Sequence, residues 1–117
     1  SKFGGKGVRA LVLTPTRELA AQVEESVRTY GKHLRLKSTM VCGGVSMGNQ
    51  LRVLRQGVDV LVATPGRLKE HVELGNINLA KTEFVVLDEA DRMLDLGFKP
   101  QLTLIKKAAD HHSTTGH

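Results

Sequence analysis

Three carboxylates stand within five residues in the sequence LDEAD (87–91), at the end of the apolar run that begins at Phe84. Such a run is typical of a buried strand, which places Asp88, Glu89 and Asp91 at a strand end. Carboxylates this close together repel one another and are costly to bury, so a cation should compensate them. An aspartate in this position can hold Mg²⁺ beside the phosphates of a nucleotide, and the neighbouring glutamate can polarise an attacking water. The alternative is a charged helix start in which Asp88 is the N-cap.

Three further segments become small, polar or glycine-rich after an apolar run. They are TPTRE (14–18), GGVS (43–46) and TPGR (64–67). In the first, Thr14 or Thr16 can cap a helix, and Arg17 adds a charged fork beside the free N–H groups of the helix start. In the last, Gly66 permits close approach of the backbone next to Arg67. Together these groups suit a sugar-phosphate backbone rather than base edges, and the alternative is a set of ordinary turns and capped helices.

Apolar, β-branched runs alternate along the chain with segments of helical period. The predicted strands span 8–13, 38–42, 58–63 and 83–87, and the predicted helices span 16–34, 47–56, 66–74 and 98–109. Most of the strands lack polar alternation, which predicts an α/β fold with a parallel sheet and helices that cover both of its faces. Because the carboxyl ends of parallel strands share one edge, the four polar segments should meet there.

Periodicity also predicts where individual side chains lie. Apolar residues recur at three- and four-residue steps in the first helix and predict its buried face. They are Leu19, Ala20, Val23, Val27 and Tyr30. We expect core positions for Cys42, Met93, Leu94 and Phe98, whereas His33 and His71 are expected on solvated helix faces.

The composition indicates one domain or part of one. The chain has 117 residues, of which 40% are hydrophobic and 25% are charged, as in an ordinary globular protein. The net charge of +5 gives a mild preference for a polyanionic partner. Cys42 is the single cysteine, so no intrachain disulfide can form, which fits a reducing compartment. Neither a membrane-spanning stretch nor a signal peptide is recognisable, so we expect a soluble, cytoplasmic protein with no membrane partner.

The polar segments resemble, in their order, the motifs of the DEAD-box RNA helicase family. The resemblance rests on PTRELA (15–20), GG (43–44), ATPGRL (63–68) and VLDEADRMLDLGF (86–98). It covers about residues 7 to 109, and the wording GVRALVLTPTRELAAQV is similar to the bacterial RhlE-type subgroup. The family has two RecA-like α/β domains of the P-loop NTPase type. This chain resembles the inner part of the first domain.

The resemblance implies a role for each matching residue. Contacts with the RNA backbone are implied for Pro15, Thr16, Arg17, Gly43, Gly44, Thr64, Pro65, Gly66 and Arg67. DEAD is the Walker B element, in which Asp88 would hold Mg²⁺ mainly through water and Glu89 would activate the water that hydrolyses ATP. Asp91 would couple the ATP site to the second RecA-like domain. The helix near 66–74 would bend one RNA strand and open a short duplex, and selectivity for RNA would rest partly on 2′-hydroxyl contacts.

Part of the family's pattern does not occur in these 117 residues. There is no G-x-x-x-x-G-K-[ST], because GGKG (4–7) lacks the following serine or threonine, so the phosphate cradle and its lysine are missing. The segment that reads adenine, the S-A-T element beyond Asp91 and the second domain are missing too. We therefore expect a partial N-terminal RecA-like helicase domain over 1–117, inactive alone, with flexible ends at 1–6 and 110–117.

Two other functions compete with the helicase hypothesis. One is a stand-alone, non-catalytic nucleic-acid-binding module. The other is a Mg²⁺-dependent nuclease that would use Asp88, Glu89 and Asp91 as metal ligands. A single strand end supplies few ligands for two metal ions, so the nuclease ranks last.

Overall fold

The computed structural model describes residues 8–44 and 46–109. The ends predicted to be flexible, 1–6 and 110–117, lie outside these residues. Within them, no helix is both long enough and apolar enough to cross a membrane.

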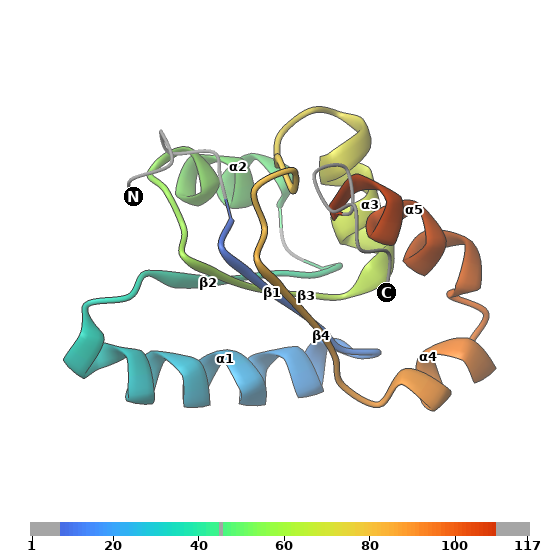
Figure 1. The fold of residues 1–117 in the computed structure, drawn as a ribbon, viewed down its shortest axis with the longest axis horizontal. Helices are drawn as coiled ribbons and strands as arrows, with labels where there is room; N and C mark the ends of the chain where they lie inside the picture. Colours follow the sequence, from blue (N-terminus) through green and yellow to red (C-terminus); the bar gives the residue numbers. More distant parts are fainter. Residues whose placement is uncertain (1–7, 45, 110–117) are drawn as a thin grey trace.

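A parallel sheet of four strands lies at the centre of the described part of the chain (Figure 1). The strands are β1 (Ala10–Leu13), β2 (Ser38–Val41), β3 (Val60–Ala63) and β4 (Phe84–Leu87). Their order across the sheet is β2-β3-β1-β4, and each neighbouring pair runs parallel. Each predicted strand is present, although each is shorter than predicted by one to two residues.

Helices lie on both sides of this sheet. They are α1 (Arg17–Gly31), the short 3₁₀ helix η1 (Lys32–Leu34), α2 (Met47–Arg55), α3 (Pro65–Glu73), α4 (Ala90–Asp95) and α5 (Lys99–Ala109). Figure 1 shows α1 on one side and α2, α3 and α5 on the other. The predicted α/β fold, a parallel sheet with flanking helices, is therefore confirmed.

The helix starts follow from the residues that precede them. Thr16 is the N-cap of α1, and its Oγ1 accepts a hydrogen bond from the backbone N–H of Leu19 at 3.2 Å. Thr14 is fully buried instead and donates its hydroxyl to the carbonyl of Thr16. Pro65 occupies the first turn of α3, where its missing N–H costs no helical hydrogen bond.

The hydrophobic core lies between the sheet and its helices. Its fully buried members from the strands include Leu11, Leu13, Val41 and Leu61, and those from the helices include Leu68, Met93 and Ile105. The predicted burial of Cys42 and Met93 is confirmed, and Phe98 packs half-buried against the same cluster.

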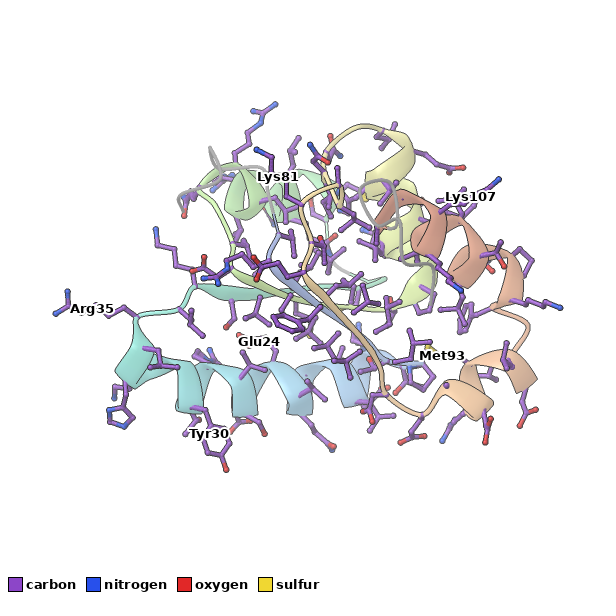
Figure 2. All side chains as sticks on the ribbon, in the orientation of Figure 1. Glu24, Tyr30, Arg35, Lys81, Met93 and Lys107 are labelled. Atoms are coloured by element: carbon purple, nitrogen blue, oxygen red, sulfur yellow. The ribbon has the colours of Figure 1, made fainter. Side chains whose placement is uncertain are left out.

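The predicted buried face of α1 is wrong at Tyr30, which is 79% exposed. Gly31 continues the inward face in its place, since it is buried. Glu24 also points inward and accepts a hydrogen bond from the hydroxyl of Ser38 at 2.9 Å. Figure 2 shows Glu24 on the sheet side of α1 and Tyr30 on the opposite side.

The expectation that helices cover the strands on both faces is wrong for β4. Its four residues are each 43% to 63% exposed, although their sequence, FVVL, is as apolar as that of any other strand. Among the described strands β4 pairs only with β1, so its second edge has no strand neighbour. Leu94, in the helix that follows, is 50% exposed and is not the core residue that was predicted.

Candidate functional site

The four polar segments meet at one edge of the sheet. The first residue of three of these segments donates a backbone hydrogen bond to the last residue of the neighbouring strand. These bonds run from Thr64 N to Val41 O (3.0 Å), from Thr14 N to Ala63 O (3.0 Å) and from Asp88 N to Leu13 O (2.8 Å). The strand order places them in the sequence GGVS, TPGR, TPTRE and DEAD along this edge. The predicted convergence is confirmed, with the three segments that carry no net negative charge adjacent and the acidic one at the β4 end.

The TPTRE segment contacts the GG turn, which we define as Gly43–Gly44. The guanidinium of Arg17 lies so close to Gly44 that a Cβ atom there would overlap its Nη1. Gly44 also has a φ of 85°, in the left-handed region that side chains disfavour. The glycine thus permits both the turn and the approach of an exposed arginine.

Arg67 brings a second guanidinium towards the same place. Its Nε lies 3.0 Å from Oε1 of Glu70, and its side chain is 17% exposed. Burial raises the pKa of the Cys42 thiol, and the charges of Arg17 and Arg67 both oppose that rise. Two cations at the starts of different helices, α1 and α3, therefore lie close enough to affect the pKa of the residue that precedes the GG turn.

The other residues predicted to contact RNA differ in what they expose. Gly43 is exposed, Thr64 and Gly66 are half-buried, and the rings of Pro15 and Pro65 are buried. The hydroxyl of Thr16, also half-buried, is engaged in the cap of α1. The two prolines therefore fix the backbone of their segments rather than offering ring surface to a ligand.

Glu89 has an unusual backbone at the acidic end of the edge. Its φ of 58° and ψ of 52° lie in the left-handed region, and it is the N-cap of α4 without a side-chain cap hydrogen bond. The alternative expectation, that Asp88 caps this helix, is therefore wrong. Left-handed backbone in a residue other than glycine is strained and is often found at functional sites.

The acidic cluster has little compensation from the described residues. Asp88 is half-buried, whereas Glu89 and Asp91 are exposed. Arg92 lies 4.0 Å from Oε1 of Glu89, but none of the described cations forms an ion pair with Asp88 or Asp91. These hard oxygen donors suit Mg²⁺, which keeps several waters and takes one or two carboxylates.

A nuclease site built on these residues gains no support. Such a site needs several carboxylates around one or two metal ions. In residues 8–44 and 46–109, no group of three or more histidine, cysteine, aspartate or glutamate side chains could hold a metal ion together.

Sequence reasoning missed a buried polar group behind the GG turn. His71, expected on a solvated face, is fully buried, and Gln50 is 5% exposed. The signal was present in the helical period, because His71 shares the apolar stripe of Leu68 and Val72 on α3. The position of His71 on this face, and not the polarity of its side chain, decides its burial.

A parallel sheet with flanking helices and with polar segments at the carboxyl ends of its strands defines the class of open α/β proteins, whose ligands bind at this edge. The chain belongs within that class to the DEAD/DEAH box helicase family, whose sequence signature matches residues 2–116.

Relatives and solved structures agree with this assignment. Probable ATP-dependent RNA helicase DDX17 of Homo sapiens is 54% identical over 101 residues, which make up 86% of this chain and 14% of that protein. ATP-dependent RNA helicase dbp2 of Sclerotinia sclerotiorum is 52% identical over 101 residues, or 18% of its length. The chain thus spans less than a fifth of these curated relatives. Both are eukaryotic, so they give no support to the bacterial RhlE-type subgroup.

Two solved structures share the RecA-like fold. The yeast DEAD-box splicing factor Prp28 superposes with a TM-score of 0.87 at 37% identity, over 94% of this chain and 26% of that one. A hypothetical ATP-dependent RNA helicase from Sulfolobus tokodaii gives 0.83 at 38% identity, over 91% and 31%.

Proposed function

We propose that this chain is part of the first RecA-like domain of an ATP-dependent RNA helicase. It binds the sugar-phosphate backbone of RNA and supplies the DEAD carboxylates for Mg-ATP hydrolysis and local duplex unwinding. The observation that carries the proposal is the meeting of Arg17, the GG turn and Arg67 at one sheet edge, next to Asp88. Its partners are RNA and the second RecA-like domain of the longer protein.

The RNA half of the site is suited to phosphate. Arg17 is exposed at the start of α1, where helix N–H groups add partial positive charge. Gly43 and Gly66 have no heavy atom within 4 Å of the place where a Cβ atom would lie, which leaves the backbone open to close approach. These groups carry no information about base identity, so binding is independent of sequence.

The ATP half of the site rests on DEAD. When bound, Mg-ATP supplies the phosphoanhydride bond whose hydrolysis drives the protein. Asp88, fixed by its backbone hydrogen bond to Leu13, would hold the metal mainly through water. Glu89 would orient and deprotonate the attacking water, and Asp91 would couple this site to the second domain.

Binding of single-stranded RNA tests the first half of the proposal. We expect Arg17→Ala and Arg67→Ala each to raise the Kd several-fold for every RNA sequence and to reduce the slope of log K against log salt by about one. A loss confined to particular bases would contradict backbone recognition.

Hydrolysis of ATP tests the second half. The purified chain should release phosphate from Mg-ATP at background rate with or without RNA, because its sequence contains no lysine-bearing phosphate loop. Asp88→Asn is the matched control, and its rate should be the same. RNA-stimulated turnover that Asp88→Asn abolishes would contradict the inactivity of the isolated chain.

A further inference from the structure

A buried run of hydrogen bonds joins the GG turn to α3 through side chains that the proposed function leaves without a role. Gln50 donates from Nε2 to the carbonyl oxygen of Cys42 at 2.8 Å, directly before the turn. Its Oε1 lies 2.9 Å from Nε2 of His71 and 3.5 Å from Nη1 of Arg67. Nδ1 of His71 lies 3.1 Å from Nδ2 of Asn76. One amide therefore contacts both the residue directly before the GG turn and the TPGR arginine.

The chemistry of the partners fixes the direction of every bond in this run. A carbonyl only accepts and a guanidinium only donates, so the Gln50 amide must turn its Nε2 to Cys42 and its Oε1 to Arg67. His71 must then donate from Nε2 to Gln50 and accept at Nδ1 from Asn76. A largely buried set of hydrogen bonds with fixed directions favours one arrangement of its side chains and restrains the groups that it joins.

We infer that Gln50 and His71 are positioning residues that hold the GG turn and Arg67 at a fixed separation, so that both contact one RNA backbone. The inference rests on the proposed function, in which these two segments bind RNA. The GG turn is exposed, and its glycines give it wide conformational freedom. Anchoring the carbonyl in front of the turn removes part of the ordering cost that RNA binding would otherwise bear.

Two substitutions of His71 distinguish a role of its hydrogen bonds in positioning the GG turn and Arg67 from a role of its volume in core packing. His71→Gln keeps a donor near the position of Nε2, whereas His71→Leu keeps the bulk and removes the donor. With a labelled oligouridylate of about ten nucleotides as the probe, we expect His71→Leu to raise the Kd about fivefold and His71→Gln to stay within about twofold. Val72→Ala is the matched control on the same helix, since Val72 packs half-buried against the core and has no part in the network. It should lower stability and leave the Kd unchanged.

Each other outcome has a definite meaning. An unchanged Kd in folded His71→Leu, or an equal rise in both His71 variants, overturns the inference while the proposed function stands. If His71→Leu fails to fold, Gln50→Met carries the same test, because it removes the amide at similar volume. If the unsubstituted chain does not bind the probe, the proposed function fails.

Amide hydrogen exchange at Gly43 and Gly44 then tests, without RNA, whether the network anchors the GG turn. Faster exchange in His71→Leu but not in Val72→Ala supports the anchoring. Equal exchange in the two variants overturns it.

Discussion

Glu89 combines a carboxylate at the candidate ATP site with a backbone that glycine would adopt more easily. Its left-handed conformation costs about 1 kcal/mol or more relative to glycine. The residue before it, Asp88, is held to the sheet by the hydrogen bond from its N–H to the carbonyl oxygen of Leu13. The carboxylate of Glu89 is therefore held at this place at the expense of the free energy of unfolding of the chain.

This conflict gives a stability prediction. Glu89→Gly and Glu89→Gln both remove the carboxylate, but only the first relieves the backbone. We expect Glu89→Gly to be more stable than Glu89→Gln by about 1 kcal/mol in urea unfolding. Equal stability of the two variants would show that the turn carries no strain.

Two glycines should respond in opposite ways to the same substitution. Gly44→Ala places a methyl group against Arg17 at a left-handed position and should lower the free energy of unfolding by about 1–2 kcal/mol. Gly48→Ala lies in α2 with only an ordinary contact, 3.6 Å from the hydroxyl of Ser46, and should raise it by about 0.5 kcal/mol. Chemical denaturation of both variants checks the pair, and a stabilising Gly44→Ala would contradict the geometry of the GG turn.

The stability of the chain should depend on pH through His71. Burial lowers the pKa of its imidazole, the charge of Arg67 lowers it further, and Glu70 acts in the opposite direction. The unfolded chain therefore binds more protons once the pH falls below the ordinary value of 6.5. This contribution to stability is fully present above that value and is lost as the pH decreases towards the folded-state pKa.

Urea unfolding at about pH 7.5 and about pH 5.5 measures this loss. His71→Gln should reduce the difference between the two conditions. A pH dependence that survives His71→Gln undiminished would assign it to other groups.

At the scale of elements, β4 has an exposed apolar edge. An apolar groove of about 530 Å³ lies beside it, lined in part by Val85, Leu87 and Leu102. Unpaired strand edges of this kind are templates for association between chains. We therefore expect the isolated chain to self-associate with rising concentration.

A charge on β4 should suppress that association. Val86→Lys places a lysine on a residue that is 52% exposed, and sedimentation should then show a larger fraction of monomer. Gln22→Lys adds the same charge to an exposed position of α1 and should have no such effect. Equal behaviour of the two variants would assign the change to net charge rather than to the strand edge.

The elements also show what could be predicted from sequence. The sequences of β3 and β4, VLVA and FVVL, are equally apolar, yet β3 is central and mostly buried whereas β4 is exposed. The apolar composition of a strand indicates that its residues favour burial. The number of strands and helices that pack against it depends on its place in the strand order, which composition does not give. The convergence of the polar segments needed only parallel strands and was predicted. The network of Gln50 and His71 depends on side-chain directions across two helices and was not.

At the scale of the whole molecule, the effect of the net charge of +5 on RNA binding must be distinguished from the effect of the contacts at the sheet edge. Lys81 precedes β4 and so lies at the amino end of the sheet, opposite the candidate edge. Arg17→Ala and Lys81→Ala each remove one positive charge. We expect the first to weaken RNA binding several-fold and the second by less than about twofold at physiological salt. Equal losses would mean that binding follows the overall field and not the contacts at the edge.

A single peptide group lies between the two halves of the candidate site. The carbonyl of Leu13 accepts from Asp88, and the N–H that follows it, on Thr14, donates to Ala63. Because the peptide unit is planar and rigid, its carbonyl and its N–H keep a fixed orientation relative to each other. It therefore links the acidic turn to the end of β3, directly before TPGR. Under the proposed function, a displacement of the acidic turn on nucleotide binding would pass through this one amide plane to the start of TPGR.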